Sequence, residues 1–231
     1  PSVVPSRILD DLEHFAWDTP VVKIDYALSG KIPWRSENLG GAGTVHLGGD
    51  MNALARAGAD LETGRIPRDP FLLFGQMTTA DPTRSPAGTE SAWSYSHLPR
   101  GVTDDEAAHE LAERMDAVLS AHAPGVSSLI VDRHLQTPRS LQDSDANLVG
   151  GAVNGGTAQL FQQLIFRPTP GLGGASTPVR DLYLSSAAAH PGGGVHGACG
   201  ANAARAALAA HRTLRRPTTY LTRKAVQRLM R

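Results

Sequence analysis

The stretch that decides the fold reads DLYLSSAAAHPGGGVHGACGANAARAALAA and runs from Asp181 to Ala210. Its apolar start, Leu182 to Leu184, predicts a short buried strand. Pro191 ends that strand, and Gly192 to Gly194 supply a turn whose backbone is free to adopt positive φ. The alanine-rich sequence from Gly197 onward favours a helix. The stretch therefore predicts a strand, a glycine-rich turn and a helix.

The glycine-rich turn would present the start of a helix to a ligand. The first turn of a helix carries unpaired N–H groups and a partial positive charge, which suit a phosphate, a carboxylate or the electron-rich edge of a flavin ring. A plain strand-to-helix turn is the alternative, but three consecutive glycines with Gly197 and Gly200 exceed what such a turn needs. We therefore expect a ligand contact at this turn.

The same turn also fits the dinucleotide-binding pattern G-x-G-x-x-G, through Gly192, Gly194 and Gly197. That pattern requires an acidic residue about twenty positions further on, at the end of a second strand. No Asp or Glu follows Asp181 in this chain. The turn is thus predicted to be a helix-terminus contact, and not part of a complete nucleotide-binding βαβ unit.

Composition indicates a globular chain in a reducing compartment. The chain has 231 residues, 41% of them hydrophobic, and no formal net charge, which allows one large or two small domains with a sizeable core. A single cysteine, Cys199, excludes an intramolecular disulfide. The sequence shows neither a signal-peptide pattern nor an apolar run that could span a bilayer, so we expect a cytoplasmic protein. Because the chain begins with Pro1 and not Met, we interpret it as a fragment or a processed chain.

The rest of the chain predicts an α+β fold with four or five mostly antiparallel strands. Strands are predicted at residues 21–28, 43–47, 71–78, 90–98 and 126–135. Helices are predicted at 8–16, 51–59 and 103–122, with a short one after Thr137. Residues 158–165 fit a helix or an extended segment equally well.

A family resemblance rests on the run His190-Pro191-Gly192-Gly193-Gly194-Val195, with Leu182–Leu184 before it and Gly197-Ala198 and Asn202–Ala204 after it. This run resembles the C-terminal signature of the phytoene dehydrogenase-like FAD-dependent oxidoreductases, within the amine oxidase-like flavoproteins. Within that group, the sequence more closely resembles the branch of pyridine nucleotide-disulphide oxidoreductase domain proteins. Weaker matches follow the family's order at 22–30, 81–83, 137–141 and 150–168.

The resemblance implies a cofactor and a domain plan. It implies that FAD is the cofactor and that its flavin ring contacts His190, Pro191, Gly192, Gly193, Gly194, Val195, Gly197 and Ala198. Residues 1–140 would be part of a substrate domain, with a mostly antiparallel or mixed sheet. Residues 141–231 would be the C-terminal part of an α/β FAD-binding domain, whose N-terminal ADP-binding βαβ unit is absent.

The resemblance also implies an activity. The whole protein would be a dehydrogenase, desaturase or saturase acting on an apolar small molecule, and the present chain alone would be inactive. No catalytic residue is assigned. The alternative, from another class, is a non-catalytic binding or interaction module derived from a truncated flavoprotein.

Other candidate residues carry weaker signals. His190, His196 and Cys199 lie close in sequence, but their spacing fits no zinc site, so no metal is expected. His190 could relay protons near the flavin or simply pack at its turn. Cys199 has no evident base and is predicted to be a small buried residue. The alternating Trp93, Tyr95 and His97 are equally consistent with a face toward an apolar substrate and with ordinary core.

The C-terminal segment, Arg205 to Arg231, holds eight Lys or Arg and no acid. A basic amphipathic helix there would allow peripheral contact with a membrane, or would simply be solvated. Nucleic acid is not expected, because basic residues and aromatic residues do not interleave in the segment. A surface left open by the missing domain would allow a homodimer.

Overall fold

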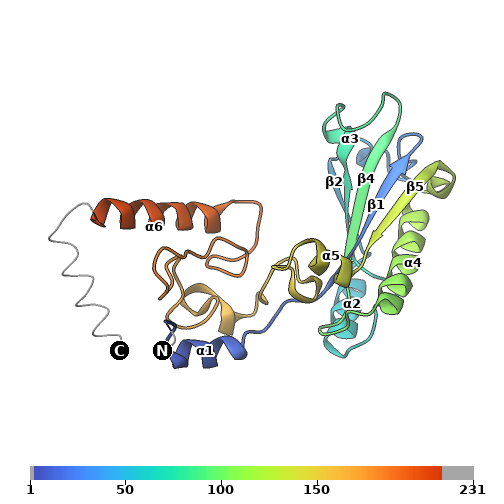
Figure 1. Cartoon of the computed structure of the whole chain (residues 1–231). Coiled ribbons are helices and arrows are strands. Elements are labelled where there is room, and N and C mark those ends of the chain that lie inside the picture. The colour runs from blue at the N-terminus through green and yellow to red at the C-terminus, as the bar shows by residue number, and fades with distance from the viewer. Residues whose placement is uncertain (1–2, 215–231) are drawn as a thin grey trace. The chain divides into compact units, whose positions relative to one another are not determined.

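The computed structural model describes residues 3–214, and the chain forms two compact units (Figure 1). The sheet unit is Thr19–Ala152, and the turn unit combines the two flanking parts of the chain, up to Asp18 and from Val153 onward. The expected domain boundary at residues 140/141 differs from these boundaries. The assignment of the two parts to a substrate domain and an FAD-binding domain stays a prediction.

The sheet unit is built on five antiparallel strands in the order β2-β3-β4-β1-β5. Their bounds are β1 Val21–Leu28, β2 Thr44–Leu47, β3 Leu72–Gln76, β4 Glu90–His97 and β5 Ile130–Gln136. The predicted α+β class, with its mostly antiparallel sheet, is confirmed.

One predicted strand starts later than expected. Residues 126–129 form a 3-10 turn, Val126–Leu129, and β5 begins only at Ile130. Gly125 adopts a left-handed conformation, φ 86°, and its carbonyl accepts from the N–H of Ser128. This tight turn draws the first four residues of the expected strand away from the sheet.

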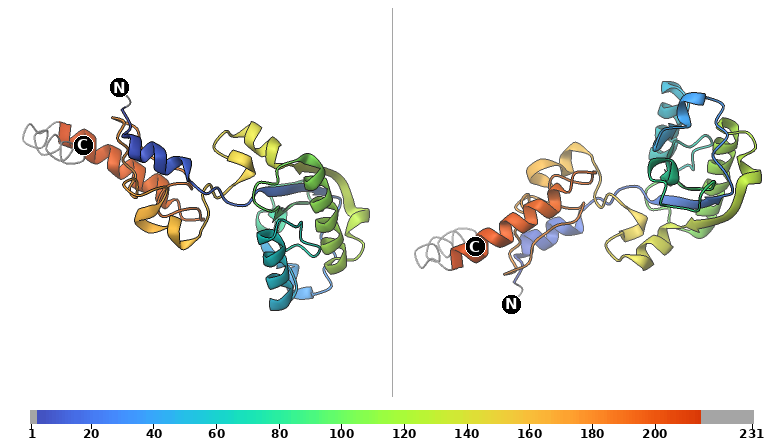
Figure 2. Two further views of the ribbon diagram at one scale, coloured as in Figure 1. Left: turned by 90° about the horizontal axis from the view of Figure 1, so that it is seen from below. Right: turned by 90° about the horizontal axis from the view of Figure 1, so that it is seen from above.

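Alternation along the strands puts one face of the sheet into the core. In β1 the buried residues Val22, Ile24, Tyr26 and Leu28 alternate with more exposed ones. Helix α4, Asp105–His122, packs against this face, as Figure 2 shows, and buries Leu111, Met115 and Leu119. Each such side chain contributes about 1.5–3 kcal/mol on burial. Asp104 is the N-cap of α4, and its side chain accepts from the N–H of Ala107.

Four of the remaining helices lie close to their predicted places: α1 Ser6–Glu13, α2 Met51–Glu62, α5 Pro138–Ser144 and α6 Ala198–Leu214. The fifth helix, α3 Met77–Ala80, was not predicted. It begins within the strand expected at 71–78, because β3 already ends at Gln76. The segment left open in the sequence, 158–165, contains two 3-10 turns, Leu160–Gln162 and Leu164–Phe166.

The turn unit has little regular structure apart from α1 and α6, and in Figure 1 its irregular segment lies between these two helices. The strand predicted at Leu182–Leu184 is wrong, because Tyr183 makes only a single bridge, to Ser176. Asp181 has a positive φ of 61°, which breaks the extended conformation just before the apolar run. Leu182 is moreover 52% exposed. The structure therefore has an isolated β-bridge at the position where the sequence predicts a strand.

A polar cluster joins three elements of the sheet unit. The Tyr26 hydroxyl on β1 donates to Oδ1 of Asp116 on α4 at 2.8 Å. Arg133 on β5 pairs with the other oxygen of Asp116, Oδ2, at 2.7 Å. Burial, and then the Asp116 carboxylate, raise the pKa of Tyr26 well above its ordinary value.

Replacing Tyr26 by Phe tests this cluster. The change removes the hydrogen bonds of the hydroxyl to Asp116 and to Ser94, so the free energy of unfolding should fall by about 1–2 kcal/mol at neutral pH. Because the pKa of Tyr26 is higher in the folded state than in the unfolded state, the protonated hydroxyl stabilises the folded state at low and neutral pH. This stabilisation is lost as pH rises above about 10. The variant should therefore lose less of its remaining stability at alkaline pH, measured by urea unfolding across a pH series. Tyr95→Phe is the control, and equal alkaline slopes for wild type and Tyr26→Phe would contradict the prediction.

Candidate functional site

The predicted ligand-binding turn, 190–197, leads directly into α6. The bond between His190 and Pro191 is cis, and Gly192, Gly194 and Gly197 have φ of 103°, 154° and 59°. The Gly197 carbonyl accepts from the N–H of Ala201, and the helix begins at Ala198, as predicted. Residues 193–197 are exposed, so their backbone faces outward at the start of a 17-residue helix.

Packing accounts for part of the glycine content of this turn. A Cβ at Gly193 would lie 1.8 Å from Oδ1 of Asn154, and one at Gly192 would lie 3.3 Å from Nε of Arg167. A Cβ at Gly194 would meet the His196 ring at 2.8 Å. Gly197 and Gly200 face open space. The glycines therefore bring the turn close to neighbouring segments, in addition to leaving its outer side free of side chains.

Arg167 fixes this turn unit from within. Its side chain is fully buried, and its guanidinium makes five hydrogen bonds to four backbone carbonyls. Three acceptors belong to Asn154, Gly156 and Thr157, at 2.9–3.0 Å, and the fourth is Ala187, at 2.7 Å from Nη2. Burial lowers the pKa of Arg167, and the nearby Asp18 carboxylate opposes that shift.

Arg167 is not among the functional residues predicted from the sequence. One signal was available, because Arg167 is the only charged residue between positions 147 and 179. An isolated charge in an otherwise uncharged stretch is typical of a buried residue with specific partners. Its partners are backbone carbonyls, which no sequence pattern identifies.

Two further candidates lie beside the turn. Cys199 is buried, and its thiol donates to the carbonyl oxygen of Gly192 at 3.2 Å, in accordance with the predicted small buried residue. The Nδ1 atom of His190 is buried and makes no hydrogen bond to any residue that the structure describes.

The aromatic stripe Trp93, Tyr95 and His97 lies on the face of β4 opposite the α4 core and is half-buried. The Trp93 and Tyr95 rings stack with centroids 5.9 Å apart, and the Tyr95 and His97 rings meet edge-on at 5.7 Å. Trp93 covers Gly75 on β3 so closely that a Cβ there would lie 2.4 Å from the indole ring. The stripe is therefore an ordered surface outside the main core.

The edge of this aromatic face is charged. Lys23 and Asp25 on β1 stand directly opposite Tyr95 and Trp93, and the two side chains form an ion pair with each other. On the same face, His134 of β5 is paired with Asp25. The face thus changes from aromatic to charged across the sheet.

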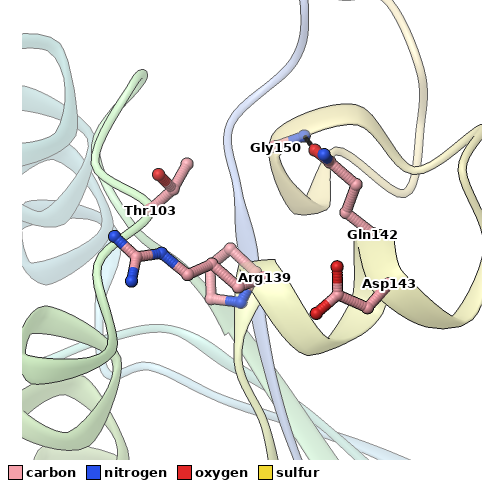
Figure 3. Close-up of a pocket in the computed structure, with 6 residues that line it drawn as sticks. Thr103, Arg139, Gln142, Asp143 and Gly150 are labelled. Carbon is pink, nitrogen blue, oxygen red and sulfur yellow. Dashed lines mark hydrogen bonds between the residues drawn. The ribbon is translucent and has the colours of Figure 1, made fainter.

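A small polar hollow of about 290 Å³ lies elsewhere in the sheet unit (Figure 3). It is lined by Thr103, Pro138, Arg139, Gln142, Asp143 and Gly150. Gln142 accepts from the N–H of Gly150, and Arg139 lies 3.8 Å from Asp105. Its Arg, Gln and Asp side chains are all exposed, so the hollow lacks the buried polar groups of a built binding site.

Two other sequence predictions concern metals and the C-terminus. Within residues 3–214, no group of three His, Cys, Asp or Glu side chains could hold a metal ion. Most of the basic segment Arg205–Arg231 lies outside the described residues. No helix in the described part of the chain is both long and apolar enough to cross a membrane.

Comparison with known proteins confirms the predicted resemblance. No model of a protein family matches the chain. The chain is 32% identical over 168 residues to "Pyridine nucleotide-disulfide oxidoreductase domain-containing protein 2" of Rattus norvegicus. The aligned region covers 70% of this chain and 29% of the rat protein. It is 27% identical over 151 residues to "Phytoene desaturase (neurosporene-forming)" of Cereibacter sphaeroides, which covers 63% of this chain and 28% of that protein.

A second desaturase, from Rhodobacter capsulatus, is 28% identical over 138 residues and carries the same description. The chain is thus related to an oxidoreductase family of enzymes. Within it, the homologues are pyridine nucleotide-disulfide oxidoreductase domain proteins and phytoene desaturases. The matched region spans less than a third of the length of these relatives.

Replacing Arg167 tests its role in the turn unit. Arg167→Met removes the donors of four buried carbonyls and should lower the free energy of unfolding by about 2–4 kcal/mol. Arg167→Lys should lose less, because an ammonium group still donates to some of them. Urea unfolding gives the stability, and hydrogen exchange of the amides in 153–197 locates the loss. Arg180→Met, at a side chain that is 90% exposed, is the control. Protection in 153–197 that is unchanged in Arg167→Met would contradict the assignment.

Proposed function

We propose that the chain is the flavin-contacting and substrate-facing part of an FAD-dependent oxidoreductase of the dehydrogenase, desaturase or saturase type. The observation that carries the proposal is the exposed glycine-rich stretch 193–197, which is followed directly by a helix of 17 residues. The oxidoreductase homologues support it.

The turn fits a flavin ring in three respects. Its exposed stretch contains three glycines, so a flat ring can approach the backbone closely. The start of α6 directs partial positive charge outward, which would favour the negative charge of a reduced flavin near N1. The buried Nδ1 of His190 has an unused hydrogen-bonding position. When bound, FAD would accept or deliver the hydride.

The residues that would hold the flavin are those predicted from the sequence, His190 to Val195 with Gly197 and Ala198. Their contribution would be to orient the ring and to stabilise charge on it through backbone N–H groups. Arg167 would act indirectly, as a positioning residue that keeps the turn in place. No side chain of the described residues is assigned as a catalytic acid or base.

An apolar small molecule remains the proposed substrate class. The support is the half-buried stripe Trp93, Tyr95 and His97, which presents stacked rings outside the core. Aromatic rings of this kind contribute large apolar contact areas with little loss of side-chain entropy.

The rival proposal is a non-catalytic binding or interaction module. It is favoured by one observation, the run of exposed apolar side chains at Leu160, Phe161, Leu164, Ile165 and Phe166, a kind of surface that often binds a partner. The two proposals differ in whether the chain, alone or within a longer polypeptide, holds a flavin.

A flavin titration tests the proposed function. FAD is added to the 231-residue chain and to a longer polypeptide that also carries an ADP-binding βαβ unit. Absorbance between roughly 350 and 500 nm and quenching of flavin fluorescence report binding. We expect the longer polypeptide to retain the flavin and the short chain to bind it weakly.

A charge introduced at the turn then locates the contact. Val195→Asp places a carboxylate at a fully exposed position where the ring should lie, and should weaken flavin binding roughly three- to tenfold. Val195→Asn is the control of equal size and should stay within about twofold. If neither polypeptide takes up flavin, the turn is not a flavin site and the non-catalytic module becomes the better proposal.

Loss of the stripe tests the substrate class separately. Trp93→Ala should lower the affinity for an apolar probe such as retinol about fivefold or more, because it removes the largest ring of the stripe. Retinol fluorescence itself is followed, because both variants lose a tryptophan and energy transfer from tryptophan would change for that reason alone. Trp17→Ala, at a half-exposed residue of the turn unit, is the matched control. Equal affinities for all three proteins would exclude the stripe as the binding surface.

A further inference from the structure

Residues 160–166 in the turn unit expose their apolar side chains and bury a polar one, the reverse of the usual arrangement in a protein. Their five apolar side chains are exposed: Leu160 91%, Phe161 60%, Leu164 67%, Ile165 69% and Phe166 45%. Gln162, in their midst, is only 3% exposed. We call the five apolar residues the apolar ridge.

Polar contacts hold the segment in this orientation. The Gln162 amide bonds the backbone of Ala16 twice, accepting from its N–H and donating to its carbonyl oxygen, both at 2.9 Å. Directly after the ridge, Arg167 is fixed by its carbonyl partners. Leu164 has a φ of 54°, a conformation that costs a residue with a Cβ free energy. The ridge is therefore an exposed surface on a fixed framework.

The exposed area of the ridge is large for a surface in water. Its summed area is on the order of 650 Å², taking about 200 Å² for each large apolar side chain when fully exposed. The largest apolar patch of a typical monomer is about 300–600 Å² and often binds a partner. A partner that covers the ridge is therefore expected.

The charge of the turn unit indicates the kind of partner. From Val153 to the end of the chain, the sequence has ten Lys or Arg and a single acid, Asp181. The two parts of the turn unit together have eleven basic and five acidic residues, a net charge of +6, and the sheet unit has eleven and seventeen, a net charge of −6. The ridge thus belongs to the basic half of a chain that is neutral as a whole.

We propose that the apolar ridge inserts into the surface of a membrane that contains anionic lipid. Leu, Phe and Ile side chains dissolve among acyl chains without a partner of matching shape, and basic residues attract the anionic headgroups. A second copy of the turn unit would instead bring a like charge of +6, and a stable pair needs about 800 Å² from each partner. The proposal is independent of the flavin assignment.

Vesicle sedimentation with the full 231-residue chain tests the proposal. Vesicles contain either phosphatidylcholine alone or an equal mixture of phosphatidylcholine and phosphatidylglycerol. The chain should sediment with the mixed vesicles, and less so as salt increases. The double variant Phe161→Gln, Leu164→Asn should bind these vesicles at least about tenfold more weakly. Asn accepts the positive φ of residue 164, so the fold should be kept.

A matched control and a folding check complete the test. Met51→Gln removes a 79% exposed apolar side chain from the sheet unit and should change vesicle binding less than about twofold. Circular dichroism melting confirms that each variant is folded. The proposal is overturned if wild type ignores the anionic vesicles or if the ridge variant binds them as well as wild type. It is also overturned if sedimentation equilibrium shows a dimer that the ridge variant abolishes, because the ridge would then seat a second copy.

Discussion

The turn unit depends on one interaction, the guanidinium of Arg167 among four backbone carbonyls. A segment without strands has no ladder in which its buried carbonyls can find donors. The planar guanidinium has five N–H groups, more than any other side chain, and can serve several carbonyls at once. Burial of a cation is unfavourable by itself, and here the carbonyl dipoles and the nearby Asp18 offset that cost. Arg167 thereby ties residues 154–157 to Ala187, three residues before the glycine-rich turn begins.

The sheet unit satisfies its backbone in the ordinary way, through strand pairing, and uses side chains to fill its core. Where its backbone leaves the ladder, a buried acid takes over: Glu90 accepts from the N–H groups of Thr78 and Thr79 at the start of α3. The two units therefore offer different surfaces for chemistry. The turn unit exposes the glycine-rich residues 193–197, whereas the sheet unit presents stacked aromatic side chains. A cofactor ring suits the first kind of surface and an apolar substrate suits the second.

Local periodicity predicted most of the regular elements because they are stabilised by the side chains that create the pattern. The alternation of Val21–Leu28 and the helical spacing of Leu111, Met115 and Leu119 both place apolar groups in one core. The prediction failed at Leu182–Leu184, since a strand also needs a neighbour and three apolar residues do not supply one.

The candidate site was predictable only in part, for a related reason. The glycine-rich turn was visible in the sequence, but the closeness of Gly193 to Asn154 was not, because the two residues are brought together only by the fold. Arg167 was overlooked for the same reason: all its partners are main-chain atoms, which are identical in every sequence.

The connection between Ala16 and Gln162 has a consequence for the order in which the chain folds. The two residues are 146 positions apart, and the whole sheet unit lies between them in the sequence. During synthesis the sheet unit is complete before the ribosome has made the second half of the turn unit. Residues 1–18 must then remain without their partners in the turn unit until residues from Val153 onward have been made, so the turn unit closes after the sheet unit has been synthesised.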